Sequence, residues 1–498
     1  MMSASLPSNP EGSFSRRDIF VLAAAVAVSL AVYLIACALS YRIGFPLDDS
    51  WIHQTYARNL ALRGEWSFLP GQPSAGSTSP LWTVLLSLGF LLRLSPYTWT
   101  FFLGGLFLFG VSLLAERNLR FTVPSYKPAI PWVGLVFVLE WHLAWAAFSG
   151  METILYIFII LLVMNVLLMN SRNYLAVGMV VGISIWVRPD GLTLLVPLSL
   201  AVVLMNSRLA SRLKTLLLLL IGFGIFFFPY LLFNLIISDN PMPNTFYAKQ
   251  AEYILWQSSP LGERLLLLGF QFFQGVTFVL IPGFIQSVIS GVRKRSWGVL
   301  LAAGWTIGYA ILYVMRLPVY QHGRYFMPAM AVFLLLGLSG FLNNFSVGWI
   351  LKTSLVHRAF IMILSTVLMI SCVFGVYTYV QDVELIESQM VDTAIWVAKN
   401  LPPDALIAAH DIGALGYFDQ HPLVDLAGLI SPDVIPFITD DRRLAEYMDA
   451  RKVQYLVAFS GWRPALIMHG EQIHIVDREA ENIRVGLGSM AVYRWSLP

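Results

Sequence analysis

Apolar segments follow one another along this chain from about residue 19 to about residue 380, and this succession restricts the folds open to it. The first run, from about 19 to 39, is long enough to span a bilayer, which takes about 20 apolar residues. Of the 498 residues, 57% are hydrophobic and only 12% are charged, whereas soluble domains carry about 25% charged residues. The sequence therefore predicts a mainly α-helical protein that crosses a membrane many times.

Lysine and arginine gather in alternate loops, and this asymmetry predicts that those loops face the cytoplasm. Two apolar stretches, at about 80–94 and 97–115, both lie between an outer loop and a basic inner loop. One of them must therefore be re-entrant, or the two form one broken crossing. We expect about 12 apolar segments, about 11 crossings of the cytoplasmic membrane and an extracytoplasmic C-terminus. The basic residues are Arg16, Arg17, Arg117, Arg120, Lys127, Arg172, Arg208, Arg212, Lys214, Arg293, Lys294, Arg295, Lys352 and Arg358.

Composition divides the chain into three parts. Residues 1–15 are polar, with Pro, Ser and Gly, which predicts a disordered N-terminus. Residues 16–380 form the transmembrane domain, whose first outer loop is 41–79. From 381 to 498 the charged residues return, which predicts an extracytoplasmic α/β domain with an accessory role on the acceptor side. Its expected strands lie at 405–409, 422–427, 453–459, 473–477 and 490–495, and its helices at about 383–400 and 441–451.

Two adjacent carboxylates, Asp48 and Asp49, stand a few residues beyond the first apolar run. Ionisable groups at a membrane boundary are costly to desolvate, so they indicate a functional site. A charged collar that only anchors the loop is the alternative. Asp49 and Ser50 are favourable helix N-caps, which leaves Asp48 freer to face a cavity.

A short amphipathic helix on the membrane surface is expected after this pair. Ile52, Tyr56 and Leu60 recur at helical spacing and would form its apolar stripe, with His53 off the stripe. Another helix is expected to start at Pro80, because a serine precedes it and proline is favoured in the first helical turn.

Five sequence blocks resemble those of a known superfamily. DDSWIHQTYARNL, followed by GQPSAGSTSPLW, resembles the first extracytoplasmic loop of GT-C glycosyltransferases, which take a sugar from a polyprenyl-phosphate lipid. Within them the chain is most similar to the group of the mycobacterial terminal arabinofuranosyltransferase. The resemblance covers most of the chain up to about residue 330. The other blocks are SGMET at 149–153, RPDG at 188–191, PNTFYAK at 243–249 and HGRYFMP at 322–328.

Inverting sugar transfer to an extracytoplasmic hydroxyl of a glycan, lipid or protein is what this resemblance implies. The acceptor hydroxyl needs a base, and the resemblance assigns that role to Asp48, with Asp49 in support. The leaving phosphate needs cations or aligned N–H groups, although each basic candidate could instead be an interface anchor. The candidate substrate-binding residues are His53, Ser77, Thr78, Glu152, Arg188, Tyr247, Lys249, His322 and Arg324.

Other functions and partners are less well supported by the sequence. The net charge of +3 gives no indication of nucleic acid binding, and the expected partners are the sugar lipid, its acceptor and membrane lipids. Asp48 and Asp49 could hold a divalent cation, although many of the resembling enzymes work without one, and the sequence leaves the metal requirement open. A secondary transporter or lipid flippase is the alternative. A transporter should show charged residues near the bilayer midplane. The apolar segments of this chain hold few acidic residues, and Glu140 is the main exception.

Overall fold

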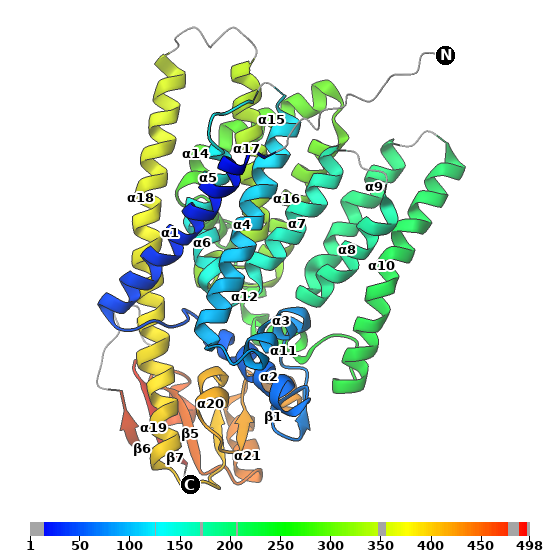
Figure 1. Cartoon of the computed structure of the whole chain (residues 1–498). Coiled ribbons are helices and arrows are strands. Elements are labelled where there is room, and N and C mark those ends of the chain that lie inside the picture. The colour runs from blue at the N-terminus through cyan, green and yellow to red at the C-terminus, as the bar shows by residue number, and fades with distance from the viewer. Residues whose placement is uncertain are drawn as a thin grey trace.

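A computed structural model gives the structure, which describes residues 14–124, 126–169, 173–205, 208–346, 355–476 and 488–495. Most of the expected disordered N-terminus, and the basic residues Arg172 and Lys352, lie outside the described residues. Figure 1 shows a bundle of helices with a small sheet domain at one end, and α2, α3 and α11 between the two. The expected combination of a helical membrane domain and a C-terminal α/β domain is confirmed.

Within the described ranges, five helical stretches are long and apolar enough to cross a membrane. The last of them, Arg358–Asn400, is 43 residues long. Shorter apolar helices complete the bundle, so the protein is a multi-pass membrane protein, while the number of crossings stays a prediction. The long helices are α1 (Arg16–Ser40), α4 (Pro96–Thr122), α10 (Leu209–Ser238), α16 (Trp297–Arg316) and α18 (Leu355–Leu385) with its continuation. The shorter ones are α3 (Pro80–Leu91), α7 (Thr153–Met169), α8 (Tyr174–Val187), α9 (Leu195–Met205) and α17 (Met327–Ser346).

The two apolar stretches near residue 90 form helices of very different length. Helix α3 begins at Pro80 as expected and has 12 residues, which is about 18 Å at 1.5 Å per residue. Helix α4 has 27 residues and exceeds the bilayer core of about 30 Å. A tight turn joins them, where the Trp99 indole donates a hydrogen bond to the Leu85 carbonyl over 2.8 Å. These lengths support α4 as the crossing, and a re-entrant stretch at 80–94 stays a prediction.

Two short helices of the bundle meet at the fully buried Glu140. Helix α5 (Trp132–Leu139) ends there and α6 (Trp141–Phe148) begins. The Glu140 carboxylate accepts a hydrogen bond from the Leu143 N–H over 3.1 Å and contacts His142 Nδ1 at 2.8 Å. Glu140 thus caps the N-terminus of α6. This structural role gives no support to a transport pathway.

The helix expected on the membrane surface is α2 (Asp49–Arg63), but it is not a surface helix. Almost every side chain from Ser50 to Ala57 is buried. The Trp51 ring contacts the rings of Tyr417 (4.7 Å) and Phe418 (4.6 Å) in the C-terminal domain. The expectation was wrong because the apolar stripe meets protein on one side and the C-terminal domain covers the other. A hairpin of β1 (Ser67–Leu69) and β2 (Gln72–Pro73) follows.

Short helices link α10 to α16, beginning with α11 beside the sheet domain and ending with α15 toward the opposite end of the bundle (Figure 1). They are α11 (Asn244–Glu252), α12 (Ile254–Ser258), α13 (Leu261–Phe272), α14 (Val276–Val279) and α15 (Ile281–Lys294).

The C-terminal sheet has the strand order β4-β3-β5-β7-β6. Strand β3 runs parallel to β4 and β5, whereas β7 runs antiparallel to β5 and β6. Each strand overlaps an apolar run expected from the sequence. The strands are β3 (Ile407–Ala409), β4 (Leu423–Asp425), β5 (Tyr455–Phe459), β6 (Gly470–Ile475) and β7 (Met490–Trp495), and the helices are α20 (Gly413–Phe418), α21 (Asp441–Ala450) and α22 (Pro464–Ile467).

A single continuous helix carries this domain. Helix α18 passes through the π-helical segment Ile386–Val391 into α19 (Asp392–Asn400). The segment is tied to the exit of α1, because the buried Glu387 accepts a hydrogen bond from Arg42 Nε over 2.7 Å. Tyr97 donates a second one over 3.2 Å. The expected domain boundary at 381 therefore falls inside a helix that is fixed to the bundle.

Candidate functional site

A cavity of about 430 Å³ lies at the end of the bundle that faces the sheet domain. The first outer loop, the turns around 151 and 189, helix α11 and the segment 312–325 all contribute to its lining. Segments far apart in the sequence therefore converge on one space, as the predicted topology allows. Of the candidate residues, those that line the cavity are Asp49, His53, Thr78, Glu152, Arg188, Lys249 and Arg324.

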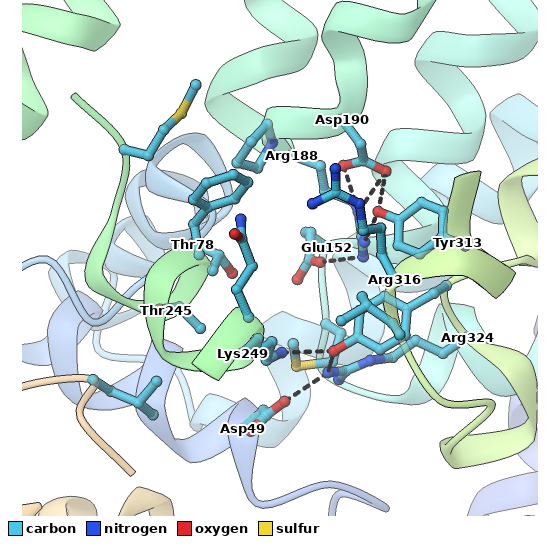
Figure 2. A pocket seen from close by; sticks show the side chains of 18 of the residues that line it. Asp49, Thr78, Glu152, Arg188, Asp190, Thr245, Lys249, Tyr313, Arg316 and Arg324 are labelled. Carbon is cyan, nitrogen blue, oxygen red and sulfur yellow. Dashed lines mark hydrogen bonds and ion pairs between the residues drawn. The ribbon is translucent and has the colours of Figure 1, made fainter. Parts of the chain in front are cut away.

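One network joins a carboxylate, two cations and a phenol. Arg324 donates a hydrogen bond to Asp49 Oδ2 over 2.7 Å, and Figure 2 shows this pair at one side of the cavity. The Tyr325 hydroxyl accepts from Lys249 Nζ at 2.6 Å and from Arg324 at 3.2 Å. Burial alone would raise the pKa of Asp49, but Arg324 and Lys249 hold it below its usual range. The same two cations outweigh burial at Tyr325 and lower its pKa to about 8.

The Arg324 guanidinium is only partly satisfied. Its side chain is 3% exposed, and its Nε and Nη1 nitrogens have no hydrogen-bond acceptor among the described residues. Buried donors are costly to leave unpaired, and a guanidinium presents them in a planar fork that fits two oxygens of an anion. The site therefore offers free donors to an anionic ligand.

A second network fixes Arg188 on the other side of the cavity, as Figure 2 shows. Its Nε donates to Asp190 and its Nη1 to Glu152, each over 3.1 Å. Its Nη2 donates to the Tyr313 hydroxyl over 3.1 Å. Tyr313 and Tyr309 in turn donate to Asp190. Each of the three guanidinium nitrogens of Arg188 thus has a partner in the protein, which favours a structural role.

Glu152 lies between the two networks. It is 3% exposed, and its Oε2 lies 3.6 Å from His53 Nε2. Burial alone would raise the pKa of Glu152, yet His53 and Arg188 lower it to about 2. It is therefore a fixed negative charge. His53 is itself held by Ser77, whose hydroxyl is 3.1 Å from Nδ1. Ser77 does not line the cavity and supports His53 instead.

Asp48 turns away from the cavity, so the expectation that it faces the cavity was wrong. Its Oδ2 accepts a hydrogen bond from the Gly413 N–H (2.7 Å) and its Oδ1 from the Ala414 N–H (2.8 Å). These N–H groups begin α20, which belongs to the HDIGALGYF segment of the C-terminal domain. A Cβ at Gly413 would lie 2.1 Å from the Asp48 carbonyl oxygen. The N–H groups of Gly413 and Ala414 therefore bind a carboxylate of the same chain.

Two further candidates also lie outside the cavity lining. His322 contacts Asp382 Oδ2 at 2.7 Å and packs between the rings of Trp141 and Trp145 at 5.6 and 5.4 Å. Tyr247 packs against Phe246, a lining residue, at 5.4 Å. The structure therefore gives His322 a packing position between aromatic residues.

Polar lining residues that were absent from the candidate set include Asp190, Tyr313, Arg316 and Tyr325. The RPDG block contains Asp190, which a helix-capping role could explain equally well. Tyr325 follows Arg324 directly, so its position next to the cations could have been inferred. Nothing local marks Tyr313 or Arg316, because they end a long apolar helix and meet the other residues only in the folded protein.

Charges in the cavity favour an anion. Four cationic side chains, including Arg316, line it against three carboxylates. Within the described ranges no group of three or more His, Cys, Asp and Glu side chains is arranged to hold a metal ion. Asp48 and Asp49 do not form a shared cation site, because Asp48 gives both oxygens to backbone N–H groups and Asp49 pairs with Arg324.

Comparisons with known proteins place the fold. The model of a domain of unknown function (DUF8728) matches residues 379–493. A search of curated proteins finds no match to this sequence.

Solved structures resemble almost the whole chain. ArnT from Cupriavidus metallidurans bound to undecaprenyl phosphate is 16% identical, with a TM-score of 0.56, over 96% of this chain and 98% of that one. The oligosaccharyltransferase AglB from Archaeoglobus fulgidus, in complex with an inhibitory peptide and a dolichol-phosphate, is 11% identical, with a TM-score of 0.60, over 97% and 75%. The arabinofuranosyltransferase AftD from Mycobacteria is 16% identical, with a TM-score of 0.53, over 98% and 40%. The chain therefore has a GT-C-like fold.

Proposed function

We propose that this protein is an inverting glycosyltransferase that moves a sugar from a polyprenyl-phosphate lipid to an extracytoplasmic hydroxyl acceptor. The observation that carries the proposal is the buried Arg324 guanidinium, with two nitrogens unpaired at a cavity that carries excess positive charge. A phosphate would supply the missing acceptors through charge-assisted hydrogen bonds. The GT-C-like fold supports the proposal, as do the structures of ArnT and AglB with polyprenyl and dolichyl phosphates.

Lys249 and Arg324 are the phosphate ligands in this proposal, ahead of Arg188. Both converge on the Tyr325 hydroxyl, which is a weaker partner for two cations than a phosphate oxygen. Arg188 already uses three nitrogens on Asp190, Glu152 and Tyr313. Apolar side chains such as Leu312 and Leu317 line the same cavity and would contact the lipid.

Asp49 is the general base in this proposal, in place of Asp48. Its side chain is 36% exposed, whereas that of Glu152 is 4% exposed, so an acceptor hydroxyl can reach it. One oxygen pairs with Arg324, and the other accepts no hydrogen bond from the described residues. A phosphate bound to Arg324 would neutralise part of the positive charge of its guanidinium. The pKa of Asp49 would then rise toward its ordinary value, which makes it a stronger base once the donor is bound.

The reaction would be a single displacement. The acceptor oxygen forms a bond to the anomeric carbon while the bond from that carbon to the phosphate oxygen breaks. The acceptor proton passes to Asp49, and the electron pair leaves with the polyprenyl phosphate, which Lys249 and Arg324 stabilise. Attack opposite the leaving group inverts the anomeric configuration. The positive-loop asymmetry supports an extracytoplasmic position for this cavity.

A transfer assay tests the proposal. The full-length protein in nanodiscs is given a panel of polyprenyl-phosphate sugars and a mixture of soluble glycan acceptors, and mass spectrometry follows the acceptors. We expect one donor to add one sugar, with the inverted anomer seen by NMR, and we expect Asp49→Asn to lose about 100-fold or more of the rate. Binding of undecaprenyl phosphate without transfer from any donor would contradict the enzyme and favour a flippase.

A further inference from the structure

A second cavity, of about 200 Å³, lies where the outer-loop hairpin meets the sheet domain. Gln72 and Ser74 contribute to it from the hairpin side, and Asp433, Tyr447 and Arg451 from the domain side. The chemistry proposed above does not use it. Junctions between domains are places where small ligands preferentially bind.

The charged groups of this second cavity balance each other. Arg451 donates a hydrogen bond to Asp433 Oδ2 over 2.9 Å, and both side chains stay at least half exposed. The guanidinium, the carboxylate and the Gln72 carboxamide each offer adjacent donor or acceptor positions. Neighbouring hydroxyls of a sugar ring match such positions. A phosphate would instead need an uncompensated cation, which only the first cavity provides.

Tyr447 adds an apolar face to this polar set. The Arg451 guanidinium lies over its ring at 5.0 Å, and the Phe437 ring is 5.6 Å away. These contacts hold the ring in place. A sugar ring has hydroxyls at its edge and C–H groups on its faces, so a tyrosine ring beside paired polar groups fits both.

Neighbouring residues of the same two segments line both cavities. Ser74 lines the second cavity and Gly76 the first. Leu429 lines the first and Ile430 the second. Asn244 holds these two segments together, because its N–H donates to the Ala75 carbonyl (3.2 Å) and its amide to the Leu429 carbonyl (3.1 Å). A chain of sugars with its end in the first cavity would reach the second by passing over the rim.

We propose that the second cavity is a saccharide subsite, which binds a sugar unit of the acceptor away from the reacting hydroxyl. This inference rests on the proposed glycosyl transfer. It gives the C-terminal domain a role, which is to hold a glycan acceptor while the cavity in the bundle binds the lipid donor.

Glycan binding without donor tests the subsite separately from the reaction. The full-length protein in nanodiscs is applied to an array of arabinan, galactan, mannan and glucan fragments. The variants are Tyr447→Ala and Arg451→Ala. The matched control is Arg442→Ala, since Arg442 also pairs with one carboxylate (Glu446, 3.0 Å) on α21 but lies outside the cavity.

We expect the unmodified protein to bind one class of fragment, and both cavity variants to bind it about tenfold or more weakly. Arg442→Ala should bind it normally, and all three variants should bind undecaprenyl phosphate normally. The subsite is overturned if no fragment binds, or if the cavity variants bind like the control. Transfer activity in a protein with either of these results would overturn the subsite alone, whereas normal glycan binding without any transfer would overturn the proposed function.

Discussion

Arg324 donates a hydrogen bond to Asp49 across 2.7 Å, which joins residues 275 positions apart in the chain. This pair places the cation proposed to bind phosphate next to the carboxylate proposed as base. Each holds the other in its charged form, since Arg324 keeps the pKa of Asp49 low and Asp49 adds to the raised pKa of Arg324. A donor phosphate would change both at once.

Asp48→Asn and Asp49→Asn should affect different properties. Asp49→Asn keeps the shape of the side chain but cannot take a proton, so transfer should fall about 100-fold or more while donor binding survives. Asp48→Asn should keep measurable turnover and loosen the C-terminal domain, because the amide can accept only one of the two N–H groups well. Transfer assays and limited proteolysis measure the two effects. A dead Asp48→Asn enzyme with an unchanged proteolysis pattern would contradict this assignment.

Arg324→Ala should weaken undecaprenyl phosphate binding by about 1.5–3 kcal/mol, or about tenfold or more, because a charge-assisted hydrogen bond is lost. Lys249→Ala should have a similar effect. Isothermal titration in detergent measures the affinity, with Arg442→Ala as a control at an exposed ion pair. Normal affinity in both cavity variants would return these side chains to the interface-anchor interpretation.

Arg188→Met should lower the stability of the protein more than its affinity for lipid phosphate. It leaves Glu152 and Asp190 buried without their shared cation, and breaking a buried pair in this way costs about 3–5 kcal/mol. Thermal unfolding in detergent should therefore show a clear loss of Tm, larger than that of Arg324→Ala. A variant as stable as the unmodified protein but unable to bind lipid phosphate would make Arg188 a ligand.

Contact between Asp48 and α20 should depend on pH. Burial, and then Asp411, raise the pKa of Asp48 to about 7, against about 3.9 in an unfolded chain. The folded protein thus binds this proton more tightly. The resulting stabilisation is present below about pH 3.9 and is lost as the pH rises through about 7. The Tm of the unmodified protein should fall relative to Asp48→Asn between about pH 5.5 and about pH 8.5. Parallel curves would contradict the raised pKa.

Reporter fusions test the sidedness. Fusions at Lys127 and Lys294 should report a cytoplasmic location, and one after Pro402 an extracytoplasmic one, because basic loops stay inside. A cytoplasmic signal from the Pro402 fusion would overturn the count of crossings and the side on which the cavity opens.

Apolar patterning predicted the positions of the helices and strands well, but not which side of each element is buried. The five strands of the C-terminal sheet lie where short apolar runs occur, because buried strands need such runs. The burial of α2 was missed because its covering residues, Tyr417 and Phe418, are remote in sequence. A helical repeat of four does place Asp49 and His53 on one face, and that signal could have placed Asp49 in the cavity.

The binding of Asp48 to the C-terminal domain could not be read from the sequence. The two residues are adjacent, and either can begin a helix. What orients Asp48 is the pair of N–H groups at Gly413 and Ala414. Residues this far apart leave no local pattern, so only the folded protein shows which carboxylate the domain takes.

One continuous helical stretch, from Arg358 to Asn400, belongs both to the membrane bundle and to the C-terminal domain. Its 43 residues extend about 65 Å at 1.5 Å per residue, about twice the thickness of the hydrocarbon core. Its last part, α19, packs alongside the sheet domain, where the Trp396 ring stacks on the His474 ring at 4.1 Å (Figure 1). Because the same helix belongs to the bundle and packs against the domain, a thinner membrane that tilts this helix would act on the acceptor side of the protein as well as on the lipid side.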